Sequence, residues 1–461
     1  MTQKTISPVD GSVYCERELA ADAAVQVALD AARRAQAAWR GVPVAERARV
    51  LSAFCDRFEA AGPEIALELT WQMGRPIRHA PSEVRGTLER ARHMIAIAAE
   101  ALADVDPGPK PGFRRFVRRE PLGVVFTVAA WNYPYLIAVN SVVPALMAGN
   151  AVLLKHSAQT PLCAERFEDC LREAGLPEGL FRALHLSHAQ TTGLIGDPRV
   201  DFVAFTGSVD GGHAVQQAAA ARFIGSGLEL GGCDPAYVRE DADLAHAVGN
   251  LVDGAFFNSG QSCCGIQRIY VHRRLYDDFV AGAIALTRKY LLGNPTDPAT
   301  TLGPVVRAAA ADHIRAQVDA SIAAGAKPAL AEREFPASRA GTPYLAPQIL
   351  LDVDHSMPAM REEIFGPVAG IMPVAGDDEA VRLMNDSAFG LTAAVWTRDP
   401  EAALAIGGRI GTGTFFMNRC DYLDPALAWV GVKDSGRGCT LSRVGYEHLT
   451  RPKSFHLRLE T

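Results

Sequence analysis

Residues 123–156 read GVVFTVAAWNYPYLIAVNSVVPALMAGNAVLLKH, and this stretch decides the fold class. Val124–Val128 is a continuous apolar run, as expected for a buried parallel strand. A helical pattern from Leu136 to Met147 follows it and ends at Gly149-Asn150, and Ala151–Leu154 then reads as a second strand. The stretch therefore predicts one βαβ unit, the building block of a doubly wound α/β domain.

The alternation of helix and strand continues on both sides of this unit. Three helical patterns precede it, at about 25–39, 44–58 and 82–105, and the second stops at Gly62-Pro63. A helix at 161–174 and a strand at 202–205 follow it. Beyond Asp241 the pattern repeats, which predicts a second α/β domain with its boundary near Gly231-Gly232. The elements expected there are a helix to Phe257, a strand at 268–271 and a helix at 275–292.

Composition excludes several classes of protein. A chain of 461 residues needs two or three domains. Lys and Arg total 46 against 52 for Asp and Glu, and the net charge of -6 argues against a nucleic-acid or anionic-membrane surface. We find no apolar run of about 18–20 residues for a membrane span and no signal peptide. The nine cysteines lack the spacing of a zinc site, so we expect no metal, reduced thiols and a cytoplasmic location.

Four short motifs are candidates for chemistry, and each also has a plain structural interpretation. Cys263-Cys264 follows Gly260-Gln261-Ser262 and, taken alone, is typical of the core. Glu229 lies in an apolar stretch before Gly231-Gly232, where it could cap a helix. Trp131-Asn132-Tyr133-Pro134 follows a predicted strand and could be a turn. Phe205-Thr206-Gly207-Ser208 ends another strand, where open amides suit a phosphate group.

Taken together and in order, the motifs are far more specific. With Lys155, Glu363-Ile364-Phe365-Gly366-Pro367 and Gly431-Val432-Lys433-Asp434-Ser435-Gly436, they closely resemble the aldehyde dehydrogenase superfamily over nearly the whole chain. Cys263 follows Glu229 by 34 positions, which matches the family's spacing of glutamate and cysteine. Departures from the common pattern include Cys233, Arg419-Cys420-Asp421-Tyr422 and the C-terminal Gly438-Cys439-Thr440.

The resemblance implies a reaction that the residue chemistry supports. Cys263 resembles the family's nucleophile, since addition of a thiolate makes the aldehyde carbon able to expel hydride. Asn132 matches the side chain that stabilises the oxyanion, and Glu229 matches the base that activates water to cleave the thioester. The product would be a carboxylic acid. The alternatives are a CoA-acylating enzyme, which retention of Glu229 disfavours, and a catalytically silent structural or binding protein.

The resemblance also implies NAD or NADP as cofactor. Residues that match cofactor contacts are Trp131, Lys155, Ala158, Gly207, Ser208, Gly212, Gly232, Glu363 and Phe365. Ala158 stands where NAD-preferring members commonly carry a carboxylate that repels the 2′-phosphate of NADP. We therefore expect NADP to be accepted at least comparably to NAD, with Lys155 and a protonated His156 free to pair with the phosphate.

The implied architecture is a Rossmann-type cofactor domain, an α/β catalytic domain and a small β oligomerisation arm. The expected ranges are 1–105 and 122–231 for the cofactor domain, 232–433 for the catalytic domain, and 106–121 with 447–461 for the arm. An alternating strand such as 115–120 is an exposed edge unless a neighbour covers it, which predicts a homodimer or a homotetramer.

The substrate is the least determined property. The residues that match the family's substrate tunnel are mostly aromatic and apolar: Tyr133, Ile137, Asn140, Phe257, Ser262, Leu423 and Trp429. No clear arginine pair is present to hold a carboxylate, although Arg419 could be aimed inward. The sequence therefore predicts a medium-sized neutral aldehyde, and a strong preference for succinate semialdehyde or another anion would show this interpretation to be wrong.

Overall fold

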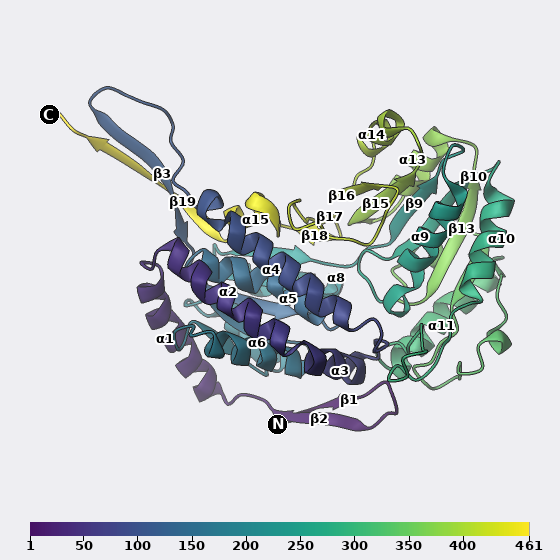
Figure 1. Ribbon diagram of the computed structural model, residues 1–461, viewed down its shortest axis with the longest axis horizontal. Coiled ribbons are helices and arrows are strands. Elements are labelled where there is room, and N and C mark those ends of the chain that lie inside the picture. Colours follow the sequence, from purple (N-terminus) through teal and green to yellow (C-terminus); the bar gives the residue numbers. More distant parts are fainter. Residues whose placement is uncertain (461) are drawn as a thin grey trace.

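A computed structural model describes residues 1–460, and it contains two α/β bodies and a projecting two-stranded arm (Figure 1). The first body is built on a six-stranded sheet in the order β18-β8-β7-β4-β5-β6. All neighbouring strands in it are parallel except β18, which runs antiparallel to β8. The strands are β4 (Val124–Ala129), β5 (Ala151–His156), β6 (Phe181–Ala183), β7 (Phe202–Thr206), β8 (Gly225–Glu229) and β18 (Gly436–Arg437).

Strand order in this sheet fixes the position of a ligand crevice. The chain runs outward from β4 through β5 to β6, and then returns to add β7 and β8 on the other side of β4. Val125 pairs with Val152 on one side and with Phe202 on the other. Since open α/β sheets bind ligands where the strand order reverses, the carboxyl ends of β4 and β7 are the expected place.

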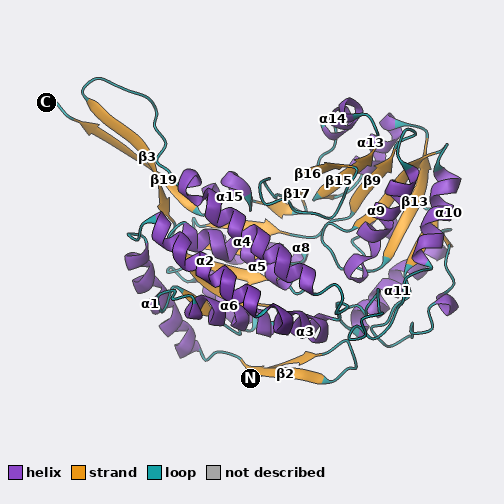
Figure 2. Cartoon of the chain, viewed as in Figure 1, coloured by secondary structure: helices purple, strands orange, loops and turns teal. Residues whose placement is uncertain are grey.

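Helices cover both sheets (Figure 2). Buried apolar side chains fill the space between helices and sheets. In the first body, α2, α5 and α6 meet around a buried aromatic cluster in which Phe54 and Phe167 stack at 5.8 Å and Phe58 packs edge-on against Tyr135. The helices are α1 (Asp22–Trp39), α2 (Val44–Ala60), α3 (Gly62–Met73), α4 (Pro81–Ala101), α5 (Pro134–Met147), α6 (Pro161–Glu173), α7 (His188–Gly196), α8 (Val209–Ala219) and α15 (Ser442–His448).

The second body has a seven-stranded sheet in the order β11-β12-β13-β10-β9-β15-β16. Its strands are β9 (Asp234–Val238), β10 (Ile266–His272), β11 (Lys327–Pro328), β12 (Gln348–Leu351), β13 (Val368–Val374), β15 (Thr392–Trp396) and β16 (Thr414–Met417). Its helices are α9 (Leu244–Phe256), α10 (Tyr276–Thr287), α11 (Ala308–Ala323), α12 (Pro358–Arg361), α13 (Asp377–Asn385) and α14 (Pro400–Gly407). A short pair of strands, β14 (Phe389–Gly390) and β17 (Val432–Lys433), runs antiparallel beside it.

Two elements were not predicted, and the end of one predicted helix was wrong. The N-terminus forms a hairpin of β1 (Thr2–Ile6) and β2 (Val13–Glu18), with Gly11 at φ 78° in its turn; Asp10-Gly11 is the turn signal that was missed. The second predicted helix, α2, does stop before Gly62-Pro63, but this pair also begins α3, which was not predicted although proline suits the first turn of a helix. The helix expected to reach residue 292 ends at Thr287.

The arm is an antiparallel pair of β3 (Phe113–Pro121) and β19 (Thr450–Arg458), which lies away from both bodies (Figure 1). Phe116 faces Phe455, and their rings stack 4.6 Å apart. The division of the chain into domains at the predicted residue boundaries stays a prediction. Among residues 1–460, no helix has the length and apolar character that crossing a membrane requires.

Candidate active site

Residues from both bodies meet at the carboxyl edge of the first sheet. Asn132 follows β4, Ser208 follows β7 and Glu229 ends β8. Cys263 comes from the second body, in the loop between the 3-10 helix η1 (Phe257–Gly260) and β10. The two sheets thus bring together the motifs that the sequence singled out.

The loop before Cys263 has a strained and well-anchored backbone. Asn258 and Ser259 have φ values of 54° and 56°, in the left-handed region that side chains rarely adopt. Gly260 follows at φ 69°, and a Cβ there would lie 2.1 Å from the carbonyl oxygen of Gly366. The Ser259 hydroxyl donates to the carbonyl of Gly303 at 2.8 Å. Such strain persists only where the surroundings fix it, so the loop holds Cys263 in one place.

The Asn132 side chain lies against this loop. It is buried, and its Nδ2 donates to the carbonyl of Gln261 at 3.2 Å, two residues before Cys263. In the other direction, the Nδ2 of Asn258 donates to the backbone carbonyl of Asn132 at 3.1 Å. The two segments are therefore tied to each other through amide groups.

A buried ion pair reinforces this connection, and sequence reasoning missed it. Arg75 and Glu83 pair with their side chains fully buried. Arg75 also donates to the Asn132 carbonyl at 2.6 Å and to Oδ1 of Asn258 at 3.1 Å. Glu83 accepts from the backbone N–H of Tyr135 at 2.8 Å, at the start of α5. The pair thus links the Asn132 turn to the Cys263 loop.

Glu229 is held by two threonine hydroxyls. Thr440 donates to its Oε1 at 2.6 Å and Thr206 to its Oε2 at 3.4 Å. Burial raises the pKa of Glu229, and the hydrogen bond from Thr440 opposes that rise. The pKa of Glu229 is therefore closer to neutral pH than the pKa of an exposed glutamate, and this suits a general base.

Cys264, the neighbour of Cys263, has a different environment. Its thiol donates to Oδ1 of Asp421 at 2.9 Å, and the Ser262 hydroxyl donates to the same oxygen at 2.8 Å. A hydrogen bond with Cys263, together with burial, raises the pKa of Cys264 well above its ordinary value. Cys264 is accordingly kept as a thiol, whereas Cys263 is partly exposed.

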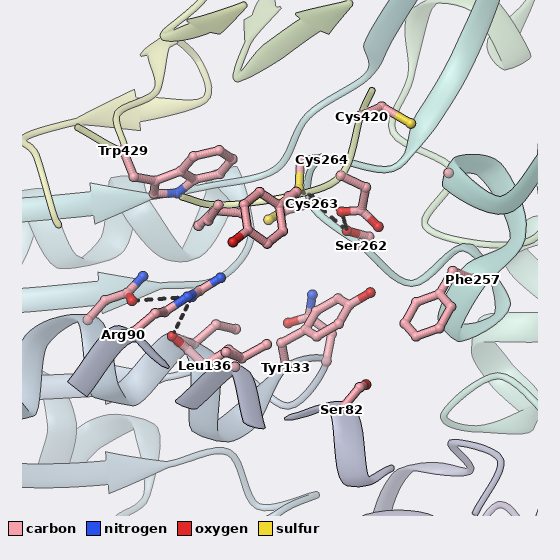
Figure 3. A pocket seen from close by; sticks show the side chains of 18 of the residues that line it. Ser82, Arg90, Tyr133, Leu136, Phe257, Ser262, Cys263, Cys264, Cys420 and Trp429 are labelled. Atoms are coloured by element: carbon pink, nitrogen blue, oxygen red, sulfur yellow. Dashed lines mark hydrogen bonds between the residues drawn. The ribbon is translucent and has the colours of Figure 1, made fainter. Parts of the chain in front are cut away.

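Two cavities meet at Cys263. One has a volume of about 550 Å³ and the other about 420 Å³, and both are lined by Cys263, Asn132, Thr206 and Glu229. The larger cavity, shown in Figure 3, contains every residue that the sequence assigned to the substrate pocket: Tyr133, Ile137, Asn140, Phe257, Ser262, Leu423 and Trp429.

The smaller cavity contains most of the residues assigned to the cofactor. Trp131, Gly207, Ser208, Glu363 and Phe365 line it, and the rings of Trp131 and Phe365 meet edge-on at 5.6 Å. The Ser208 hydroxyl accepts from the backbone N–H of Gly211 and caps α8, which also carries Gly212. Gly232 lies beside the Cys263 loop, and Lys155 and Ala158 lie at and just beyond the end of β5, outside this lining.

The family model described as "Aldehyde dehydrogenase family" matches residues 1–455. A protein of Mycobacterium tuberculosis named "Succinate-semialdehyde dehydrogenase [NADP(+)] 1" is 35% identical over 98% of both chains. The chain belongs to the aldehyde dehydrogenase family. This membership confirms the predicted fold class and the predicted class of enzyme, an NAD(P)-dependent aldehyde dehydrogenase.

Solved structures of aldehyde dehydrogenases share the whole architecture. An NAD-dependent aldehyde dehydrogenase from Sinorhizobium meliloti is 33% identical, with a TM-score of 0.95 over 100% of this chain and 92% of that one. A succinic semialdehyde dehydrogenase from Streptococcus pyogenes, solved with NADP+, is 28% identical, with a TM-score of 0.94 over 99% of this chain and 100% of that one.

The residues of this aldehyde dehydrogenase fit a dinucleotide. Burial raises the pKa of Glu363 to about 7, and among residues 1–460 its carboxylate accepts one hydrogen bond, from the N–H of Gly232 at 3.1 Å. Hydroxyl donors of a ribose would satisfy that carboxylate. Burial also lowers the pKa of Lys155, which forms no ion pair within the described chain. An anionic or hydroxyl partner would likewise suit its ammonium group.

His156 does not serve the role that the sequence suggested. It is buried, and burial lowers its pKa to about 4. One ring nitrogen lies 3.1 Å from the carbonyl of Pro134, and the other accepts from the N–H of Ser157 at 3.0 Å. His156 is therefore neutral at pH 7 with both nitrogens engaged, so it cannot pair with a phosphate.

Sequence reasoning named Arg419 as a side chain that could be aimed into the larger cavity, but it missed two other arginines there. Arg85 and Arg90 on α4 and Arg419 after β16 all line it. Arg419 stacks on the ring of Tyr422 at 3.9 Å, and Arg90 is buried. The sequence predicted a mostly apolar substrate pocket, because it indicated only the apolar face of α4 and not that arginines of this helix line the cavity.

Proposed function

We propose that this enzyme oxidises an aldehyde to a carboxylic acid through a thioester on Cys263. The observation that carries the proposal is the position of Cys263 where the two cavities meet, with Asn132 and Glu229 lining both. A substrate carbonyl in the larger cavity and a nicotinamide in the smaller one would reach the same sulfur atom.

Each residue has one role in the reaction. The Cys263 thiolate adds to the aldehyde carbon, and the Nδ2–H groups of Asn132 and the backbone N–H of Cys263 stabilise the oxyanion. When bound, the nicotinamide supplies the acceptor for the hydride that leaves this carbon. Glu229 then takes a proton from water as the water attacks the thioester, and Cys263 leaves as thiolate. Retention of Glu229 favours water over CoA as the acyl acceptor.

The choice of Cys263 over Cys264 rests on acidity and exposure. The raised pKa of Cys264 keeps that group protonated, and its hydrogen is directed at Asp421. A thiol in this state is a poor nucleophile.

For the cofactor, we propose that NADP is accepted at least comparably to NAD. Ala158 is exposed, and its position provides no carboxylate to repel a 2′-phosphate, while Lys155 is free of acidic partners within residues 1–460. The M. tuberculosis relative is named for NADP(+). An Ala158→Glu variant should shift the ratio of kcat/KM toward NAD by about tenfold or more, because a charge a few ångströms from the phosphate costs about 1–4 kcal/mol. A wild-type preference for NAD of about a hundredfold would overturn the proposal.

The direct test of the reaction is the formation of NAD(P)H at 340 nm with wild type and with Cys263→Ala, using Cys264→Ala as the matched control. Wild type and Cys264→Ala should turn over, and Cys263→Ala should not. Equal rates for wild type and Cys263→Ala would refute the role of Cys263.

We also propose a homodimer or homotetramer in the cytoplasm. The projecting β3–β19 pair supports assembly, because within residues 1–460 no further strand pairs with the outer edge of β19, and the outer edge of β3 is bridged only locally, as between Val105 and Val117. All nine cysteines are free thiols, in keeping with a reducing compartment. A monomer in light scattering at micromolar concentration would contradict the assembly.

A further inference from the structure

Arg90 is a buried cation in the wall of the larger cavity. It lies on the face of α4 that packs against α5, and 8% of its surface is exposed. Figure 3 shows its guanidinium pointing into the cavity, on the side opposite Trp429. Burial lowers the pKa of Arg90, and the charge of Glu229 offsets this only in part. A buried cation without an anionic partner is costly, so its retention calls for an explanation.

The protein provides hydrogen-bond acceptors for only some of the N–H donors of this guanidinium. Its Nη1 donates to the carbonyl of Leu136 at 2.8 Å and to Oδ1 of Asn140 at 3.2 Å. Within residues 1–460, Nε and Nη2 have no hydrogen-bond partner, and Arg90 forms no ion pair. In Asn140, Oδ1 is the atom that accepts from Arg90, and Nδ2 has no hydrogen-bond partner within residues 1–460. Two side chains therefore offer unused donors from the same wall.

None of the acidic side chains that line the cavity pairs with Arg90. Asp421 accepts from Ser262 and Cys264, and Glu229 accepts from Thr440 and Thr206. Glu89 accepts from the hydroxyl of Tyr422 at 2.8 Å. Asp253 also lines the cavity, where burial raises its pKa, and within residues 1–460 it forms no ion pair or hydrogen bond with Arg90. None of them occupies the free donors of Arg90.

We propose that Arg90, oriented by Asn140, binds the carboxylate of the substrate, so that the enzyme prefers short aldehydes with a carboxylate at the other end. This inference rests on the proposed function, since the aldehyde group must reach Cys263. Both residues line one cavity of about 550 Å³, large enough for a four-carbon semialdehyde. A guanidinium is well matched to a carboxylate, because it donates two parallel hydrogen bonds.

The experiment compares succinate semialdehyde with butanal, a neutral aldehyde of the same length, by kcat/KM. Wild type should prefer succinate semialdehyde by about a hundredfold, and Arg90→Met should lose about that factor in the ratio of kcat/KM for succinate semialdehyde to kcat/KM for butanal. The ratio is the readout, because Arg90 also interacts with the charge of Glu229, which serves both aldehydes alike. Arg90→Lys should give an intermediate value, because it keeps the charge but not the fork. Arg92→Met is the matched control: it removes an arginine from the same helix whose exposed side chain pairs with Glu59, and it should behave as wild type.

The outcomes separate the two proposals. If wild type oxidises neither aldehyde, the proposed function fails. If it oxidises butanal as well as succinate semialdehyde, the carboxylate site is overturned and the proposed function stands. If Arg90→Met keeps the wild-type preference, Arg90 is not the anchor. A test without any variant uses inhibition of wild type: succinate should compete with the aldehyde and the neutral succinamide should not, and equal inhibition by both would overturn the proposal.

Discussion

Replacing Arg75 with methionine should destabilise the protein and slow the reaction together. Arg75 and Glu83 are fully buried, and Arg75 bonds both the Asn132 turn and Asn258. Methionine preserves most of the volume but leaves the Glu83 carboxylate without its counter-charge. Breaking a buried ion pair in this way costs about 4 kcal/mol.

The cost converts into a shift of the melting temperature. Unfolding entropy scales with chain length, and for 461 residues it amounts to about 1 kcal/mol per degree. Arg75→Met should therefore lower the Tm by about 4 °C, and so should Glu83→Gln. The double variant has no unpaired charge, so it should lose no more than either single variant, whereas independent effects would add to about 8 °C.

Differential scanning calorimetry at one protein concentration measures these shifts, and stopped-flow NAD(P)H formation measures the first turnover. The first turnover of Arg75→Met should be about tenfold slower, since the Asn132 turn loses an anchor. Arg49→Met is the control, because Arg49 pairs with Glu46 on the surface, where solvent screens ion pairs and they contribute little to stability. A Tm of Arg75→Met within 1 °C of wild type, or additive losses in the double variant, would refute the reasoning.

Two further variants test the surroundings of the reacting groups. Thr440→Val removes the hydrogen bond that lowers the pKa of Glu229, so this pKa should rise further. The acidic limb of the pH profile of kcat should then move to higher pH by about one unit. An unmoved limb would show that Thr440 does not control the pKa of this base. Gly232→Ala would place a Cβ 2.4 Å from the carbonyl oxygen of Cys263, so the nucleophile must shift and kcat should fall by about a hundredfold. Wild-type kcat in Gly232→Ala would show that the loop yields freely.

The sequence was sufficient to predict those site residues that lie in short, distinctive motifs. Asn132, Glu229 and Cys263 are recognisable because each lies in a motif whose order and spacing are specific, and the structure brings these three together around shared cavities. The βαβ unit at 123–156 was predictable because a buried parallel strand is apolar throughout.

The residues that were missed act through contacts distant in sequence. Arg75 bonds Asn132 and Asn258, which lie 57 and 183 residues away. On α4, the sequence indicated an apolar face, but the structure also buries Glu83, Thr87 and Arg90, which share a second face at helical spacing. Periodicity alone does not reveal that this polar face meets α5 beside a cavity. Likewise, nothing local shows that the carbonyl of Pro134 will engage His156.

The most direct test of the account is the covalent state of Cys263 when hydrolysis is blocked. Glu229→Gln is mixed with an aldehyde and NADP, quenched in acid, and digested for mass spectrometry. We expect a burst of NADPH close to one per active site, no further turnover, and the mass of the acyl group on the peptide that contains Cys263, as a thioester at that residue. An acyl group on Cys264, or full steady-state turnover by Glu229→Gln, would contradict the central claim.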